Sequence, residues 1–340
     1  MVDINDVALL AGVSTATVSR ALSGKNTVSN STRSKVLRAA DELGYVVSST
    51  ASSLSSGRTK NVGIVLPFLD RWYFSSVVDG AEATLRRYGY DLTLYNLRGG
   101  AESRSHIFTH FLHRKRIDAL IAVALELADE EVESLLALGK PIVGIGGPIA
   151  GVTTLDLNNV EVARLGTAHL IELGHTDIAF IGSPADLGAA FLLGENRFSG
   201  FEKAMNDAGL PIHERSFRPA DFSIQSGYDA GRRLFEDARW GPTAVFAASD
   251  EMAIGCILAA REFGLTIPGD LSIVGVDDHE LASVFGLTTI AQHPRKQGEQ
   301  AVEVLMQQLL QTGTPGDART IVDFELITRS SAGRPARRSC

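Results

Sequence analysis

The sequence predicts an α/β protein with an N-terminal three-helix head of the helix-turn-helix type, a hinge, and a two-lobed body of doubly wound parallel sheets. Three observations predict this organisation. A short helical pattern is interrupted at Gly12, a Ser-rich stretch follows the head, and from Asn61 onward apolar strands alternate with helices. A chain of 340 residues that is 44% apolar can fill two or three separate cores.

The first 46 residues contain three apolar stripes at helical spacing, which predict three short helices around one small core. The stripes are Val7, Ala8 and Ala11, then Val18, Ala21 and Leu22, and then Val36, Leu37, Ala40 and Leu43, in a helix expected after Ser31 and Thr32. A generic helical bundle is the alternative. Small residues at the expected helix crossing and turn favour a helix-turn-helix, because they let the two helices approach closely.

The segment from Ser14 to Arg20 is the expected second helix of this head. It is crowded with small hydroxylated side chains and carries one Arg, a surface suited to a DNA major groove. Residues 1–60 hold seven basic and four acidic side chains, a balance of +3, whereas the whole chain carries -8. The sequence therefore predicts a basic head that contacts a polyanion and an acidic body that does not.

Residues 47–60 are predicted to form a hinge. Most of them are hydroxylated and Gly57 lies among them, a composition typical of a flexible linker. Leu54 is unusual in this setting because no local core is available to it. It is either incidental or a wedge that becomes useful when a partner arrives.

From Asn61 the alternation of strands and helices predicts a parallel sheet with helices on both faces, and the pattern then restarts. The expected strands are 62–66, 92–95, 119–123 and 142–145, and then 178–181, 244–247 and 273–276. The helices between them are expected to end near Gly89, Gly139, Gly174, Gly209 and Gly264. Two similar lobes result, and their facing strand ends predict a cleft that binds a ligand.

Cofactor and metal chemistry lack support in the sequence. No Gly-x-Gly-x-x-Gly follows a first strand and no Gly-x4-Gly-Lys-Ser/Thr is present, so we expect no cofactor. His106, His110 and His113 could share a helical face for a metal, but they lead directly into Arg114, and a solvated basic helix end is the preferred interpretation. The run from Asp277 to Glu280 could be a metal or acid site, or could accept hydrogen bonds from ligand hydroxyls.

The expected location is the cytoplasm. Cys256 and Cys340 offer neither a disulfide framework nor a metal-binding spacing, which fits a reducing compartment. The N-terminus lacks the basic and apolar regions of a signal peptide, and no run of about 18 apolar residues occurs. We therefore expect neither export nor a membrane span.

These features closely resemble the lactose-repressor and galactose-repressor (LacI/GalR) family of bacterial transcription factors, over the chain up to about residue 330. The matching segments, in order, are Asp6-Val7-Ala8, Ala11-Gly12-Val13-Ser14, Thr17-Val18-Ser19-Arg20, Val28-Ser29, Thr32-Arg33, Leu43-Gly44-Tyr45, Asn61-Val62-Gly63, Leu173-Gly174-His175, Arg197 with Gly200-Phe201, Ser249-Asp250-Glu251-Met252-Ala253, Ser272-Ile273-Val274-Gly275-Val276-Asp277-Asp278 and Leu287-Thr288-Thr289-Ile290. The body in that family resembles periplasmic sugar-binding proteins, in agreement with two lobes.

The resemblance implies a domain organisation. Residues 1–46 would be the DNA-binding domain, 47–60 the hinge, 61–330 the body that binds effector and dimerises, and 331–340 a tail. Within the body, the expected lobes are about 61–157 with 291–320, and about 158–290 with 321–330.

The resemblance also implies roles in DNA binding. Thr15 and Ala16 would occupy the base-reading positions, but both are small, so direct readout would depend on Arg20, whose fork fits guanine. Phosphate contacts would come from Ser14, Thr17, Ser19, Asn26 and Thr27, with Ser14 also capping its helix. Leu54 would enter the minor groove from paired hinge helices. Val47 and Ser48 replace a usual Pro and Asn. A hinge this rich in Ser is expected to be disordered off DNA and to fold only with both the operator and the dimer partner.

The ligand site implied by the resemblance lies in the cleft. Its expected residues are Tyr73, Phe74, Arg197, Phe222 and Asp277, with Asp70, Asn158, Ser249, Asp250 and Gln292 as further candidates. Aromatic faces with an Arg and carboxylates suit a sugar first and a nucleoside second. Phe74 could instead be core, and Asp250 could cap the helix that follows it.

The function expected from the sequence is a ligand-controlled repressor that is a homodimer and binds a near-palindromic operator, without enzymatic activity. A dimer is favoured over a tetramer because residues 329–340 lack apolar heptads. Two alternatives remain: a solute-binding protein without a regulatory role, which the head disfavours, and a sugar- or nucleoside-processing enzyme, for which no mutually supporting catalytic residues are evident.

Overall fold

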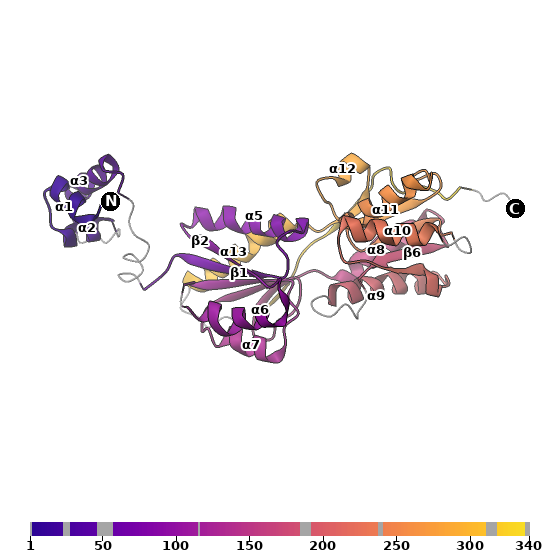
Figure 1. The fold of residues 1–340 in the computed structure, drawn as a ribbon, viewed down its shortest axis with the longest axis horizontal. Helices are drawn as coiled ribbons and strands as arrows, with labels where there is room; N and C mark the ends of the chain where they lie inside the picture. Colours follow the sequence, from indigo (N-terminus) through magenta and orange to yellow (C-terminus); the bar gives the residue numbers. More distant parts are fainter. Residues whose placement is uncertain are drawn as a thin grey trace. The chain divides into compact units, whose positions relative to one another are not determined.

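The computed structural model describes residues 2–22, 28–45, 57–114, 116–183, 192–236, 241–310 and 318–336. The chain divides into two compact units, residues 1–60 and residues 61–340 (Figure 1). Each unit has its own hydrophobic core, and each is described separately below.

The first unit contains three helices, α1 (Ile4–Ala11), α2 (Thr15–Leu22) and α3 (Asn30–Glu42). Asp3 caps α1 in a capping box, and the helix ends at Gly12, whose φ of 66° is the left-handed conformation that glycine adopts without strain. Ser14 Oγ accepts a hydrogen bond of 3.2 Å from Thr17 N, which confirms its expected capping role. This geometry produces the tight turn that joins α1 to α2.

The core of the first unit is formed by Val7, Val18 and Val36, all of which are fully buried. The prediction was wrong for one core residue: Leu37 is 50% exposed, and Ala39 is buried instead. Ala39 is three residues from Val36 and lies on the same face of α3, whereas Leu37 is the adjacent residue and is turned about 100° around the helix. This helix begins at Asn30, capped by Ser29, rather than after Thr32, although the capping hydroxyl does bond to Thr32 N at 3.3 Å.

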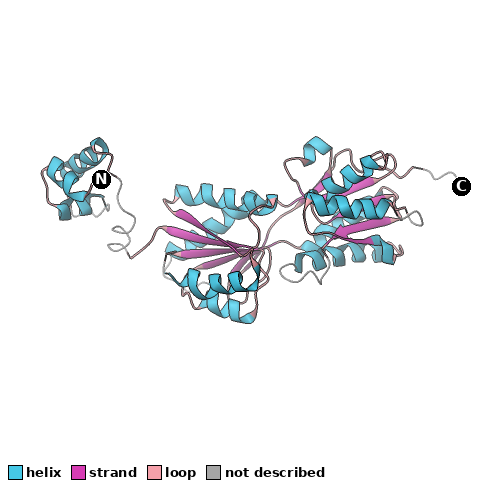
Figure 2. Cartoon of the chain, in the orientation of Figure 1, coloured by secondary structure: helices cyan, strands magenta, loops and turns pink. Residues whose placement is uncertain are grey.

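The second unit contains two six-stranded sheets (Figure 2). The first sheet has the order β11-β5-β4-β3-β1-β2, and every pairing in it is parallel. Its strands are β1 (Asn61–Leu66), β2 (Asp91–Asn96), β3 (Ala119–Val123), β4 (Ile142–Ile145), β5 (Thr153–Asp156) and β11 (Arg319–Ile321). We call the part of the unit built on this sheet the first lobe.

The second sheet has the order β12-β10-β9-β8-β6-β7 and defines the second lobe. Its strands are β6 (Ile178–Gly182), β7 (Phe217–Pro219), β8 (Ala244–Ala247), β9 (Ser272–Asp277), β10 (Thr288–Ala291) and β12 (Glu325–Ile327). The edge strand β12 pairs antiparallel with β10, so this sheet departs from the all-parallel arrangement that the sequence predicted.

Helices cover both faces of each sheet (Figure 1). In the first lobe these are α5 (Trp72–Arg87) and α13 (Pro294–Leu310) on one side, and α6 (Gly100–His106) and α7 (Asp129–Leu136) on the other. In the second lobe they are α8 (Asn159–Glu172), α9 (Leu192–Asp207), α10 (Ile224–Phe235) and α11 (Asp250–Glu262), with the short α12 (Ala282–Phe285). The strands they cover, such as β3 and β9, are buried along their whole length.

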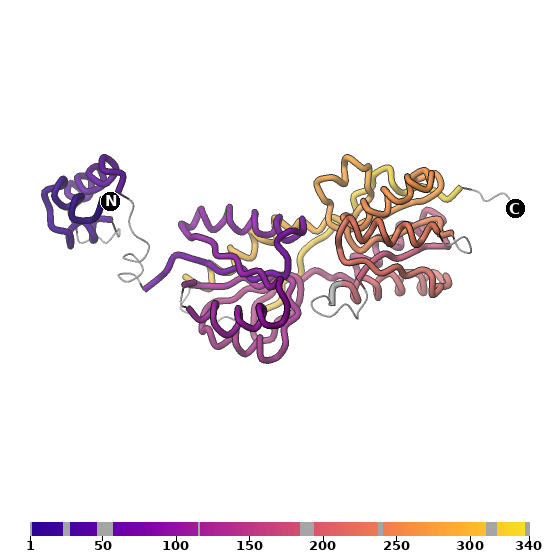
Figure 3. Tube along the Cα trace, viewed as in Figure 1, coloured from indigo at the N-terminus to yellow at the C-terminus, as the bar shows by residue number. Residues whose placement is uncertain are grey.

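The chain passes between the two lobes three times (Figure 3). The crossings follow β5, β10 and β11, so each lobe is assembled from segments that are distant in sequence. The sequence did not predict β5, β7, β10, β11 and β12. Three of these have only three residues, and β5 and β10 each open with two Thr residues, which interrupt the apolar pattern.

The segment after β12 packs into the second lobe. Ser331 is buried, and its backbone accepts a hydrogen bond of 2.8 Å from Ile273 N and donates one of 2.8 Å to Gly286 O. His175 is also buried and lies 2.8 Å from Gly333 O through Nε2. Ser331 and Gly333, which the sequence assigned to a tail, are therefore packed in the second lobe.

The segment that carries His106, His110 and His113 was expected to be helical, but it is not a regular α-helix. After α6 the chain forms a π-helical turn, Ile107–Phe111, and then a 3₁₀ turn, Leu112–Arg114. The rings of His106 and His110 stack with centroids 4.6 Å apart, whereas His113 lies 3.3 Å from Ser134 Oγ. Within the described ranges, no group of three or more His, Cys, Asp or Glu side chains is arranged to hold a metal ion. The helices of those ranges are also too short or too polar to cross a membrane.

Candidate functional site

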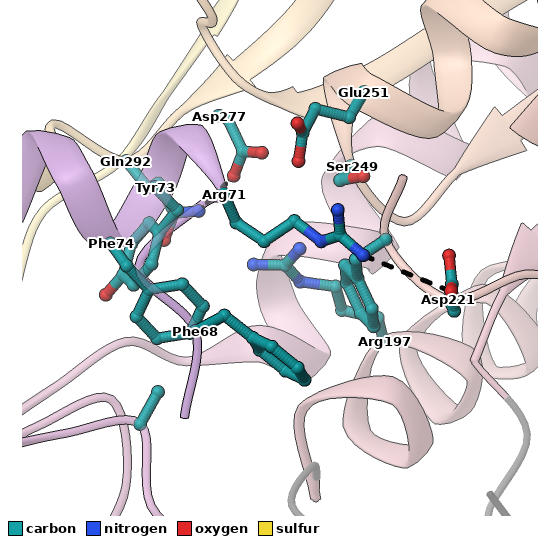
Figure 4. A pocket seen from close by; sticks show the side chains of 12 residues that line it. Phe68, Arg71, Tyr73, Phe74, Arg197, Asp221, Ser249, Glu251, Asp277 and Gln292 are labelled. Carbon is teal, nitrogen blue, oxygen red and sulfur yellow. Dashed lines mark hydrogen bonds and ion pairs between the residues drawn. The ribbon is translucent and has the colours of Figure 1, made fainter. Parts of the chain in front are cut away.

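A cavity of about 520 Å³, open to solvent on one side, lies where the two lobes meet (Figure 4). Its lining is aromatic and charged, and consists of Phe68, Arg71, Tyr73, Phe74, Ala124, Arg197, Asp221, Phe222, Ser249, Glu251, Asp277 and Gln292. We call it the aromatic compartment.

The aromatic compartment is built from the carboxyl ends of strands in both sheets. Phe68 to Phe74 follow β1 and Ala124 follows β3, whereas Phe222 comes after β7, Ser249 after β8 and Asp277 at the end of β9. Because the carboxyl ends of parallel strands meet at one edge of a sheet, side chains that are distant in sequence converge there.

Arg197, on α9, is the largest fully buried side chain of the site and is 1% exposed. Its Nε donates to Asn159 Oδ1 over 3.0 Å, and its Nη1 donates to the carbonyl oxygen of Ala248. Its Nη2 is buried and has no hydrogen-bond partner among the described residues. Burial lowers the pKa of the guanidinium, and the nearby Asp277 opposes that change.

Leaving a buried guanidinium N–H without a partner costs free energy. Figure 4 shows the guanidinium of Arg197 projecting into the aromatic compartment. The site is therefore suited to a ligand that supplies an oxygen acceptor at that point.

Three carboxyl groups lie at or beneath the opposite wall. Asp277 accepts a hydrogen bond from Gln292 Nε2, and burial raises its pKa while Arg197 lowers it. Asp250, beneath the wall, accepts from Thr289 Oγ1 at 2.7 Å and from His279 N at 2.8 Å, and burial together with Asp277 raises its pKa. Burial raises the pKa of Glu251 to about 7.

The aromatic side chains form the remaining wall. Tyr73 donates its hydroxyl hydrogen to Gln297 Oε1 over 2.9 Å, which fixes the ring at the start of α5. The rings of Tyr73 and Phe74 meet edge to face with centroids 5.3 Å apart, and Phe68 lies 6.2 Å from Phe74. Such faces can stack on a flat or ring-shaped ligand.

Backbone strain is concentrated at this site. Ala124, Phe222 and Asp277 all line the compartment and all have positive φ, at 45°, 62° and 133° respectively. Non-glycine residues rarely adopt such angles, and they persist where the surrounding structure imposes them. The strain shows that the positions of these three residues are fixed by packing rather than by local preference.

The structure brings seven of the expected ligand residues together at this compartment: Tyr73, Phe74, Arg197, Phe222, Ser249, Asp277 and Gln292. Three others do not line it. Asp70 is exposed and pairs with Arg98. Asn158 caps α8 and lines a different cavity. Asp250 is buried behind the wall and is not the helix cap, since Ser249 caps α11.

Sequence reasoning missed several lining residues, above all Phe68, Arg71, Asp221 and Glu251. Arg71 lies 4.0 Å from Asp221, and this ion pair joins the two lobes. The only signal for these residues was their proximity in sequence to expected ones. That signal could not show which side chains turn inward.

In the first unit, the expected DNA-contacting residues share one face of α2. Thr15, Ala16, Ser19 and Arg20 are exposed, whereas Thr17 is half-buried beside the core residue Val18. The remaining expected contacts, Asn26, Thr27 and Leu54, lie outside the described residues. Helix α2 thus offers a small, hydroxylated outer surface with one long basic side chain.

Comparisons with known proteins agree with this arrangement. Residues 3–48 match the family model described as "Bacterial regulatory proteins, lacI family", and residues 167–332 match a periplasmic binding protein-like domain. The HTH-type transcriptional repressor PurR of Vibrio atlanticus is 34% identical over 314 residues, covering 91% of this chain and 92% of that protein. PurR of Haemophilus influenzae is 34% identical over 338 residues, covering 97% and 98%.

Solved structures extend the likeness to three dimensions. The Lac repressor dimer bound to operator and the anti-inducer ONPF has a TM-score of 0.84 at 28% identity, covering 98% of this chain and 99% of that one. The complex of the transcriptional regulator CelR with cellobiose has a TM-score of 0.71 at 29% identity, covering 97% and 100%. This chain belongs to the lacI family of bacterial regulatory proteins and is a ligand-responsive transcriptional regulator that binds DNA.

Proposed function

We propose that this regulator is a dimeric repressor of a near-palindromic operator, and that a flat heterocyclic ligand in the aromatic compartment controls its affinity for DNA. The observation that carries the ligand assignment is the unpartnered Nη2 of Arg197 in a cavity walled by aromatic rings. Operator binding by a dimer is proposed from the similar Lac repressor structure, which is a dimer on its operator.

DNA reading is assigned to the exposed face of α2. Arg20 is the one long basic side chain there, and it would read a guanine, while Thr15 and Ala16 make smaller contacts. One head with a single long reading side chain is too weak for specific binding. Two heads on two half-sites are needed, which predicts an inverted repeat.

The lining favours a nucleobase or nucleoside over a sugar, the first of the two expected classes. Four aromatic rings offer stacking faces, and the donor of Arg197 and the acceptor of Asp277 face the same space. A carbonyl with an adjacent ring N–H, as nucleobases carry, matches that donor and acceptor. The polar side chains of the lining could also bond to sugar hydroxyls, and the similar regulator CelR is solved in complex with cellobiose, so the ligand panel below includes sugars.

Control of DNA binding would come from closure of the lobes on the ligand. The first lobe contributes Tyr73 and Phe74 to the compartment, and the second contributes Arg197 and Asp277. The ring of Trp72 also meets that of His279 across the cleft, with centroids 4.9 Å apart. A ligand that contacts both lobes shifts the population toward the closed state, and couplings of about 1–3 kcal/mol are typical.

The domain assignment follows the same logic. We assign residues 1–46 to DNA binding, 47–60 to the hinge, and 61–330 to effector binding and dimerisation, with no catalytic role. The protein would act in the cytoplasm, where its operator lies.

The test is a selection of duplexes from a random DNA pool by the full chain, followed by fluorescence anisotropy with panels of nucleobases, nucleosides and sugars. We expect an inverted repeat, a shift of DNA affinity of about 5-fold or more with one nucleobase or nucleoside, and loss of that shift in Arg197→Met. Arg164→Met is the control, because Arg164 pairs with Glu161 on the surface. A response to sugars alone would refute the ligand class, and no enriched sequence would refute DNA reading.

A further inference from the structure

A second cavity, of about 960 Å³, lies beside the aromatic compartment. The two share Ala124 in their linings. The second cavity is walled by the segments after β3 and β4, by the end of β5 and the start of α8, and by Asn196 and Arg319. We call it the polar compartment, because the described residues of its lining include amides and charges and no aromatic side chain.

The two compartments are linked through adjacent side chains. Asn159 lines the polar compartment and accepts the 3.0 Å hydrogen bond from Arg197, which lines the aromatic one. Asn196, in the polar compartment, directly precedes Arg197 in α9. A ligand bound to Arg197 would therefore lie near side chains that line the polar compartment.

Two adjacent glycines, Gly146 and Gly147, belong to the lining of the polar compartment. A Cβ placed on Gly147 would meet no atom within 4 Å, and Gly147 does not have a positive φ. Gly146 does have a positive φ, of 87°, so a side chain there would be strained. Position 147 lines the polar compartment and can thus carry a side chain without backbone strain or a clash at Cβ.

The charges in the polar compartment favour a neutral polyol over a phosphate. Among the lining residues that the structure describes, Arg319 is the one cation and pairs with the buried Asp156, whereas Glu126 adds a further negative charge. The net charge of these lining residues is therefore negative, and a negative net charge repels an anion. Asn158 and Asn196 add amide groups, which can bond to hydroxyls as donors and acceptors.

We propose that the ligand is a neutral nucleoside, with its base in the aromatic compartment and its ribosyl group in the polar compartment. This assignment rests on the proposed function, since it takes the aromatic compartment as the site of the base. It adds that a free base fills only part of the site, and that a nucleotide is disfavoured by the negative lining.

The experiment is isothermal titration calorimetry of the full chain with matched series of free base, nucleoside and nucleoside 5′-monophosphate. The probes are hypoxanthine, inosine and inosine monophosphate, together with the equivalent adenine, guanine, cytosine and uracil series. For the series that binds, we expect the nucleoside to bind about tenfold tighter than its base, as one or two added hydrogen bonds would produce. The monophosphate should bind more weakly than the nucleoside.

The steric variant Gly147→Leu is designed to fill the polar compartment. We expect it to reduce the affinity for the nucleoside to that for the free base, while the affinity for the base stays within about twofold, a difference smaller than one hydrogen bond. Gly147→Ala is the matched control and should leave both affinities unchanged. Retained base binding also shows that the variant is folded.

The outcomes separate this inference from the proposed function. Equal affinity for base and nucleoside, or an equal loss of both in Gly147→Leu, would overturn the role of the polar compartment and leave the base site standing. Tightest binding by the monophosphate would overturn the assignment of a neutral group. Binding of no base, nucleoside or nucleotide would overturn the proposed ligand class itself, and this inference with it.

Discussion

The Nε of Arg197 donates a 3.0 Å hydrogen bond to Oδ1 of Asn159, and both side chains are buried. Asn159 is the first residue of α8, directly after the chain crosses from the first lobe to the second. The same residue also donates through Nδ2 to Leu157 O over 3.2 Å, within the crossing itself. The ligand-facing Arg is thereby tied to the segment about which the lobes would move.

Replacing Asn159 with Ala should weaken ligand binding although Asn159 does not line the aromatic compartment. Without its acceptor, the buried Nε of Arg197 loses about 1–3 kcal/mol of stabilisation and the guanidinium is no longer held in place. We expect the ligand affinity to fall at least severalfold in calorimetry, with a lower melting temperature. Asn206→Ala, on the exposed part of α9, is the control. An unchanged affinity in Asn159→Ala would show that Arg197 needs no such support.

Removing the hydroxyl of Tyr73 should lower the stability of the fold, because this hydroxyl makes a buried hydrogen bond. In Tyr73→Phe, Gln297 Oε1 loses a 2.9 Å hydrogen bond in a buried setting. The free energy of unfolding should fall by about 1 kcal/mol in urea titration. Tyr88→Phe removes the hydroxyl of an exposed tyrosine and should change it little. Equal effects of the two variants would mean that the Tyr73 contact adds nothing to the fold.

Glu251 should make stability depend on pH. Its pKa is raised to about 7 in the folded chain, so between pH 4.5 and 7 the folded state holds more of this proton than the unfolded state. Its contribution to stability is then present at low pH and is lost as pH rises through 7. One titrating group can change the free energy of unfolding by at most about 1.4 kcal/mol per pH unit. The change for Glu251 should be smaller than this limit, because its carboxyl group keeps some solvent contact.

The check is urea unfolding between pH 5 and 8 for the wild type and Glu251→Gln. The variant should show a flatter dependence over this range. Glu195→Gln, on the exposed surface of α9, serves as the control and should keep the wild-type slope. Parallel curves for the wild type and Glu251→Gln would contradict a raised pKa at this position.

His175 should hold the C-terminal segment in the second lobe. Its ring nitrogens lie 2.8 Å from Thr243 Oγ1 and 2.8 Å from Gly333 O, and burial lowers its pKa. His175→Phe leaves Thr243 Oγ1 and Gly333 O without this hydrogen-bond partner. Each loss should lower the free energy of unfolding by no more than about 1–3 kcal/mol. Hydrogen exchange of residues 331–334 should accelerate, whereas His169→Phe should leave it unchanged. Slow exchange in both variants would show that the segment is held by other contacts.

Arg20 should account for most of the base-specific DNA affinity. In Arg20→Ala, binding to the selected operator should weaken by about 1–3 kcal/mol and discrimination against changes at one base pair should relax. Arg38→Ala, on α3, is the control, because the Arg38 Nε donates to its own helix at Ser34 O. Anisotropy over a range of salt concentrations separates a lost base contact from a lost phosphate contact. Unchanged specificity in Arg20→Ala would exclude base reading by this side chain.

Much of the fold was predictable because strong local patterns encode it. The helices of the head carry caps and a Gly12 turn that act within a few residues, and the seven apolar strands predicted for the body are all present. The short edge strands were not predictable, since β7, β11 and β12 have three residues each and owe their conformation to pairing with a neighbour.

The sequence by itself determined the class of the protein, the helix-turn-helix head and the strand ends at which a ligand site could form, because these depend on local spacing. Only the tertiary structure decided which side chains face the ligand. Asp70 and Arg71 are neighbours, yet one turns out to pair with Arg98 and the other lines the cavity. That choice depends on the orientation of each side chain in the packed lobes, as does the burial that leaves Arg197 Nη2 available to a ligand.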